Sequence, residues 1–195
     1  MADPAYIVDG VLTDGEAWVG IATTTLGSDT AVVTFTSPDD GSSTDWSQFM
    51  DLVVVAYVQC ANAAYNSNEL SVTFNNDTTA NIYDWQRLYG TGSSVAAASG
   101  DDAYMLWGEF PGLNSGTNNF GCVIAHLFDI NSGKYKSVLT QSAGDRDGAG
   151  AVRLDAVTFK SQAPLTEMDI AQAYGEDHTA GSMFSLFGVL PRMVA

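Results

Sequence analysis

Two histidines are the residues best suited to acid–base or nucleophilic chemistry in this chain. His126 alternates with apolar residues in the run 123–128, which favours a strand histidine that faces solvent or a core histidine with satisfied hydrogen bonds. His178 lies in the stretch 175–181, which favours a loop between the last two strands. Nucleophilic catalysis needs such a base within reach of a serine or cysteine, and no Gly-x-Ser-x-Gly elbow, phosphate-binding loop or dinucleotide motif occurs. We therefore predict no catalytic residue and no enzymatic activity.

Carboxylates in turn segments are the second group that could do chemistry. Asp145-Arg146-Asp147-Gly148 is similar to the start of an oxygen-ligand calcium loop, and Asp39-Asp40 and Asp101-Asp102 are further pairs. The first segment lacks the later carboxylates and the terminal glutamate that complete such a cage, so an ordinary Asp-Gly hairpin turn is favoured. Glycoside hydrolysis needs one acid with a raised pKa in a cleft, whereas carboxylates in turns are solvated. We predict no metal ion and no cofactor.

Aromatic residues form a third group, with 4 Trp, 8 Tyr and 9 Phe in the chain. The stretch 82–89 mixes aromatic and hydrogen-bonding side chains, which suits a sugar platform or a protein interface. Trp85, Tyr89 and Trp107 are therefore candidate contacts with a partner or a glycan. About half of the aromatic residues are expected in the core.

Composition limits the classes of partner. The formal net charge is −16, from 23 acidic and 7 basic residues in 195, so the field of the protein repels nucleic-acid phosphates and anionic membrane surfaces. Neither a secretion signal nor an apolar stretch of membrane-spanning length is present. Cys60 and Cys122 each lie in an apolar run, which predicts buried free thiols of a protein made in a reducing cytoplasm.

Alternation at period two recurs along the chain and predicts strands with one solvated face, as in 31–36, 70–74 and 183–189. The runs 52–58 and 120–128 are apolar at both parities and predict strands covered on both sides. With turn residues between the strands, the pattern predicts an all-β protein: a single, jelly-roll-like β-sandwich of about ten strands with little helix. The best helical candidate, 166–174, fits a strand about as well. We expect one domain over 1–195, with a possible N-terminal arm over 1–15 and a C-terminal tail over 190–195.

Several turn-and-strand motifs carry a family resemblance. They comprise segments 24–29 and 32–35, Phe74-Asn75-Asn76-Asp77, Tyr83, segment 87–93 and the strand 180–189. Together they resemble a β-rich domain that is widespread in virion proteins of tailed bacteriophages, over about residues 20–190. The chain departs from that pattern at Phe187, where tyrosine is common, and in carrying residues 191–195 beyond the usual last strand.

The resemblance implies a β-sandwich that is either a separate head-decoration (cement) protein or part of a tail fibre. A short chain without a coiled coil, whose acidity suits the outside of a DNA-filled head, favours a decoration protein on the outer capsid surface. Its expected partners are the major capsid protein and itself, as a homotrimer at three-fold lattice sites. The terminal segments 1–12 and 190–195 are expected to act as arms on neighbouring subunits, which makes Arg192 and Met193 candidate contacts.

The alternative is a tail-fibre or receptor-binding module that binds carbohydrate. In that case Trp85, Tyr89 and Trp107 would stack on sugar rings from loops while asparagine and aspartate side chains bond the hydroxyl groups. A phage hydrolase is the least supported hypothesis, because the chain offers no convincing acid pair.

Overall fold

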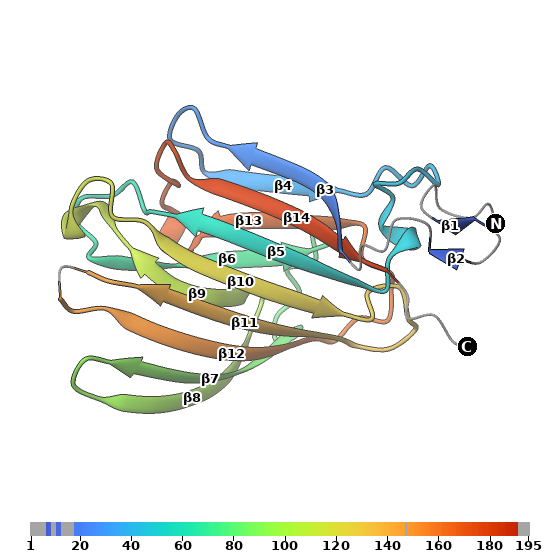
Figure 1. Ribbon diagram of the computed structural model, residues 1–195. Helices are drawn as coiled ribbons and strands as arrows, with labels where there is room; N and C mark the ends of the chain where they lie inside the picture. Colours follow the sequence, from blue (N-terminus) through green and yellow to red (C-terminus); the bar gives the residue numbers. More distant parts are fainter. Residues whose placement is uncertain (1–6, 9–10, 13–17, 147, 191–195) are drawn as a thin grey trace.

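The computed structural model describes residues 7–8, 11–12, 18–146 and 148–190. Two antiparallel sheets pack face to face, one of eight strands and one of four, and Figure 1 shows the small sheet behind the large one. A short hairpin, β1 (Ile7–Val8) with β2 (Val11–Leu12), precedes them. This arrangement is a β-sandwich, as predicted, with twelve strands in its two sheets.

The large sheet has the strand order β3-β14-β5-β10-β11-β12-β7-β8. Its strands are β3 (Trp18–Thr25), β14 (Met183–Val189), β5 (Asp51–Val58), β10 (Gly121–Phe128), β11 (Lys136–Gly144), β12 (Ala151–Phe159), β7 (Tyr83–Thr91) and β8 (Val95–Asp102). Every neighbouring pair is antiparallel. The β7–β8 hairpin forms one edge of this sheet (Figure 1).

The small sheet has the strand order β4-β13-β6-β9. Its strands are β4 (Val32–Thr36), β13 (Glu167–Gln172), β6 (Ser67–Phe74) and β9 (Met105–Pro111). Three single-turn 3-10 helices connect strands, over Trp46–Gln48, Leu113–Ser115 and Ala173–Gly175. The segment 166–174 is thus mostly strand, because Met168, Ile170 and Gln172 point inward at period two.

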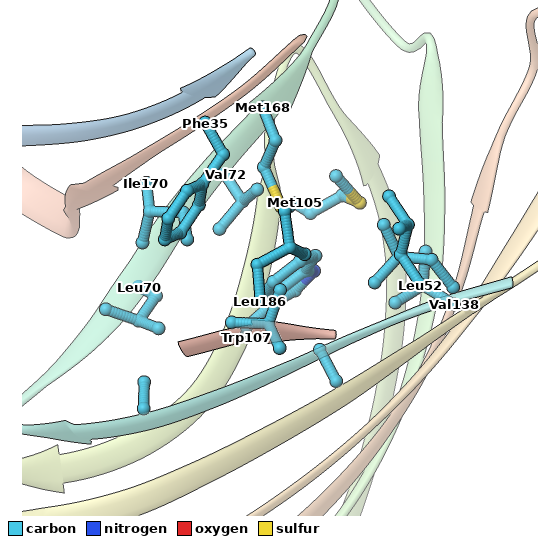
Figure 2. Packing of buried hydrophobic residues seen from close by; sticks show 14 of the residues in the cluster. Phe35, Leu52, Leu70, Val72, Met105, Trp107, Val138, Met168, Ile170 and Leu186 are labelled. Atoms are coloured by element: carbon cyan, nitrogen blue, oxygen red, sulfur yellow. The ribbon is translucent and has the colours of Figure 1, made fainter. Parts of the chain in front are cut away.

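The core lies between the sheets and follows from the predicted alternation. Val33 and Phe35 of β4 are buried while their neighbours are exposed, and Leu70, Val72 and Phe74 repeat this pattern on β6. Figure 2 shows Phe35, Leu70 and Val72 packed with residues of the large sheet. Trp107 of β9 lies at the centre and is fully buried, with its ring edge-on to Phe74. Removing such area from water is the main favourable term in folding.

Three further sequence-based expectations need correction. The run 120–128 is covered on one side only, because Ile124 and Phe128 of β10 are exposed. Cys60 is a buried free thiol as predicted, but Cys122 is free and exposed, since it points to the same side as Ile124. Leu190, assigned to a tail, is buried in the core. Residues 191–195 and most of 1–15 lie outside the described residues.

Candidate functional site

In the middle of the strand β12, charged side chains point inward and apolar side chains point outward, while Val157 and Phe159 further along point inward into the core. Arg153 and Asp155 are almost completely buried, whereas Val152 is 66% and Leu154 38% exposed. Neighbouring strands also bury a charged side chain or expose apolar ones. Lys136 of β11 is buried, and Leu139 of β11 and Leu88 of β7 are exposed. In an ordinary solvated sheet, the apolar side chains face the core. The outer face of the large sheet is therefore its unusual surface.

The inward charged side chains bond the backbone at the edge of the small sheet. β9 is an edge strand, and its backbone approaches the large sheet where β11 and β12 lie. Arg153 donates to the carbonyl of Leu106, and Asp155 accepts from the N–H of Gly108, in hydrogen bonds of 3.1 and 3.3 Å. Buried backbone groups need such partners. β9 pairs with β6 on one side only. Side chains of β12 thus bond backbone groups on its other, free edge.

Gly108 allows this close approach. Its φ of +64° lies in the left-handed region, and a Cβ there would lie 2.6 Å from Cβ of Ser142. The hydroxyl of Ser142 accepts a hydrogen bond of 2.9 Å from the N–H of Glu109. β9 is therefore bonded to side chains of both β11 and β12.

A buried ion network surrounds this contact. Nε of Arg153 lies 2.7 Å from Oδ2 of Asp155, and Nε of Arg87 lies 3.0 Å from Oδ1 of the same carboxylate. Both guanidinium groups also pair with Glu69 of β6. Burial lowers the pKa of Arg153 from its usual value, and the adjacent Asp155 opposes this. Each charge of the network thus has an oppositely charged partner, as buried charges require, although Nη2 of Arg87 is buried without a hydrogen-bond partner.

The outer face is defined here by side chains of the large sheet that point away from the small sheet. One cross-strand row runs from β10 to β8 through Ile124, Gln141, Leu154, Leu88 and Ala97. The row on one side of it comprises Cys122, Ala143, Val152, Gly90 and Val95, and the row on the other side comprises His126, Leu139, Ala156, Gln86 and Ser99. No Asp, Glu, Lys or Arg occupies these rows, although the chain carries 23 acidic residues.

His126 is the one titratable imidazole on the outer face. Its Nε2 lies 3.0 Å from Oδ2 of Asp51, and its ring stacks on Phe128 with centroids 4.0 Å apart. Asp51 also accepts a hydrogen bond of 2.8 Å from the N–H of Asp129. The predicted strand position of His126 is confirmed. Its carboxylate partner orients the ring beside rows that carry no Asp, Glu, Lys or Arg, while Asp84 and Asp101 occupy the next row of the β7–β8 hairpin.

Shallow hollows interrupt the outer face. One, of about 690 Å³, lies beside Tyr57, Cys122 and Val152. A second, of about 780 Å³, is lined by Phe128 and Leu139 and by polar residues of β7 and β8 that include Asp84 and Asp101. A third, of about 420 Å³, lies beside Leu88, Val95 and Leu154. A surface with both apolar area and relief can be matched by a complementary protein surface.

The aromatic side chains singled out from the sequence lie elsewhere, and all three are on strands rather than in loops. Trp107 is fully buried, so it cannot contact a partner, and that expectation is wrong. Trp85 faces inward on β7 and packs against the core, with the guanidinium carbon of Arg87 4.9 Å from its ring centroid. Tyr89 is half-buried on the same side of β7. Arg192 and Met193 lie outside the described residues.

The other candidate groups take structural positions. His178 lies between the last two strands, as predicted, and is fully buried: one ring nitrogen lies 3.1 Å from the carbonyl oxygen of Ile170, and the other 3.1 Å from Nε2 of Gln172. The Asp145 carboxylate accepts a hydrogen bond of 2.7 Å from the N–H of Gly148, within the β11–β12 turn. Among the described residues, no group of three or more His, Cys, Asp or Glu is placed to hold a metal ion. In that part of the chain, no helix is long and apolar enough to cross a membrane.

Sequence analysis missed the outer-face residues of β11, β12 and β7. Alternation in 151–159 is visible in the sequence, but it does not say which parity faces the core. One available signal was the charge: Arg153 and Asp155 are two residues apart and so lie on one side of a strand, where they can pair. Such a pair can be buried when its hydrogen bonds are satisfied.

Comparison with known proteins yields only distant structural similarity. No protein-family model matches the chain, and no curated sequence matches it. Among solved structures, the Ruminococcus gnavus IT-sialidase CBM40 is 13% identical over 88% of this chain and 95% of that one, with a TM-score of 0.32. The same module bound to α2,3-sialyllactose gives 14% identity, coverage of 86% and 92%, and a TM-score of 0.32. A TM-score of this size assigns neither a family nor a ligand.

Proposed function

We propose that this chain is a structural protein of a bacteriophage particle that decorates the outer surface of the head. It docks the outer face of its large sheet on major capsid protein subunits. The observation that carries this proposal is the outer side of β12, where Val152 and Leu154 are exposed and Leu154 lies in a row with Ile124 and Leu88. Exposed apolar patches of this extent mark interaction sites.

The size of the outer face suits this role. Eight strands about 4.8 Å apart, each contributing about seven residues of about 3.4 Å, span an area on the order of 800 Å². A specific protein–protein interface buries about that area on each partner. The net charge of −16 directs the protein to the outside of a DNA-filled head, and the uncharged rows allow this acidic chain to approach a partner without burying an unpaired carboxylate.

The test is co-sedimentation of the purified protein with empty shells of the major capsid protein encoded in the same genome. Leu154→Asp and Ile124→Asp each place a charge in the centre of the outer face, and we expect each to weaken binding at least tenfold. The matched control is Val32→Asp, because Val32 is similarly exposed on β4 of the other sheet. Equal binding by all three variants, or no binding by the wild type, would contradict the proposal.

A homotrimer at three-fold sites of the head lattice remains part of the proposal. Sedimentation equilibrium of the free chain and counting of copies in a reconstruction of the particle would test it. The alternative, a carbohydrate-binding tail module, loses the contribution of Trp107, and its other two aromatic residues, Trp85 and Tyr89, are partly buried on a strand instead of lying in loops. Copies at the tail, with none on the head, would favour it.

A further inference from the structure

A pair of tyrosines lies at one end of the sandwich, away from the outer face. Tyr174, in the turn after β13, is 74% exposed, and its ring lies parallel to that of Tyr65 with centroids 6.1 Å apart. Tyr65 is partly buried and packs against the core. One face of the Tyr174 ring is thus supported from within while the other is open to solvent.

The backbone holds Tyr174 in an unfavourable conformation. Its φ of 65° and ψ of 16° lie in the left-handed region, which a bulky non-glycine residue rarely adopts. The carbonyl of the preceding Ala173 accepts a hydrogen bond of 3.1 Å from the buried amide of Asn68. Three residues later, the carbonyl of Asp177 accepts one of 2.9 Å from the N–H of Ala61. The turn is therefore fixed on both sides, and the exposed ring is preorganised.

The two segments that carry these tyrosines also line a polar hollow of about 410 Å³. Its lining includes Asn62 and Ala63 from one segment and Gly175, Glu176 and Asp177 from the other. The Asn62 amide donates a hydrogen bond of 2.8 Å to the Glu176 carboxylate. The carboxylates of Glu176 and Asp177 in this hollow thus follow the exposed Tyr174 closely in the chain.

We propose that Tyr174 and this hollow form a binding site for a neutral pyranose sugar. The C–H-rich face of the ring stacks on the open face of Tyr174, and its hydroxyl groups donate to carboxylates of the hollow. A rigid ring binds at low entropic cost, and aromatic faces with a few placed polar groups are typical of such sites. Anionic sugars are disfavoured because Asp29, Glu176 and Asp177 line the hollow.

This site differs from the glycan platform expected from the sequence, which used Trp85, Tyr89 and Trp107. It is also independent of the docking proposal, because it uses a different surface. A decoration protein with this site would present sugar-binding groups at one end of the sandwich.

The test is saturation-transfer difference NMR of the full chain with methyl β-D-glucopyranoside, methyl β-D-galactopyranoside and methyl β-D-glucuronide. We expect saturation of the ring protons of at least one neutral glycoside, and at least a threefold weaker signal from the glucuronide, which differs from the glucoside only in its C6 carboxylate. Tyr174→Ala should remove the signal and Tyr174→Phe should retain it. Tyr135→Ala is the matched control, since Tyr135 is 55% exposed on another loop.

Several outcomes would overturn this proposal. They are no transfer to either neutral glycoside at millimolar concentration, an equal signal from Tyr174→Ala and the wild type, or a glucuronide signal as strong as that of the glucoside. Tetramethylammonium serves as a further probe: binding of this cation at Tyr174 without binding of a neutral glycoside would assign the site to cations instead. Shell binding by Tyr174→Ala should equal that of the wild type, which separates this test from the docking test.

Discussion

The middle of β12 places charged side chains on the buried inner side of the sheet and apolar side chains on its solvent-facing outer side. On the inner side, Arg153 and Asp155 are buried and bonded to the backbone of β9. On the outer side, Val152 and Leu154 face solvent. Arg153 and Asp155 point inward because backbone groups of β9 lie on that side and need hydrogen-bond partners. The inner face bonds the backbone of the edge strand β9, and the outer face presents three cross-strand rows without charged side chains.

The half of the sheet around β5 follows the ordinary rule. Leu52, Val54 and Ala56 belong to the core, as does Leu186 of β14, which pairs with Val54. Figure 2 shows Leu52 and Leu186 in this cluster. There the small sheet covers the large one with apolar side chains from β6 and β13. At β12, the cover is the edge of β9, which presents backbone polar groups instead. The inward residues are charged at Arg153 and Asp155, where β9 presents its backbone, and apolar again at Val157 and Phe159 of the same strand.

Breaking the inner network is predicted to have the largest effect. Asp155→Ala removes one of the two carboxylates that pair with the buried Arg153 and removes the acceptor of the Gly108 N–H. Removing one partner of a buried pair costs about 3–5 kcal/mol, and we expect a loss of this size in the free energy of unfolding in urea. The control is Asp84→Ala, which removes an exposed carboxylate 2.8 Å from Lys160 and should cost at most about 1 kcal/mol. Equal losses would show that the network is not buried as described.

A second buried polar group, His178, predicts a pH dependence. Burial lowers its pKa below the usual 6.5, against smaller opposing effects of the Ile170 carbonyl and Asp177. Because the unfolded chain then binds a proton more readily than the folded chain, this contribution to stability is complete above pH 6.5 and decreases as the pH falls below it. Urea unfolding between pH 7 and 5 should show a smaller decrease for His178→Gln than for the wild type. A wild type whose stability rises as the pH falls over this range would be inconsistent with a neutral buried imidazole.

The outer face predicts the smallest effect on stability. Leu154→Ser changes an exposed side chain, and surface substitutions away from special features alter stability by about 0.5 kcal/mol or less. Phe159→Ala, at the fully buried inner side of the same strand, should cost about 3–5 kcal/mol. Thermal unfolding of both variants measures the contrast. A loss above about 2 kcal/mol for Leu154→Ser would mean that Leu154 belongs to the core.

Much of the fold could be predicted from the sequence, because period-two alternation and turn residues are local signals. Asn75 and Asn76, assigned to a turn, have φ values of 52° and 56°, which asparagine tolerates better than most residues. The inward direction of Val33 and Phe35 likewise follows from local pattern.

The candidate site could not be predicted in the same way. Which parity of β12 faces inward depends on β9, a strand that precedes β12 by about forty residues and pairs with it only through side chains. The fully buried position of Trp107 and the exposed ring of Tyr174 also depend on packing between distant segments. Neither composition nor periodicity contains that information.

The most direct test of the central claim is the thiol reactivity of two cysteine variants of β12 in a Cys122→Ser background. Leu154→Cys places a thiol on the outer face, and Val157→Cys places one on the inner face beside the core. We predict that the first reacts with a water-soluble disulfide reagent in the native protein, and that the second reacts only as fast as the protein unfolds. Fast reaction of Val157→Cys with protection of Leu154→Cys would show that β12 has the opposite orientation, and the outer docking face would not exist.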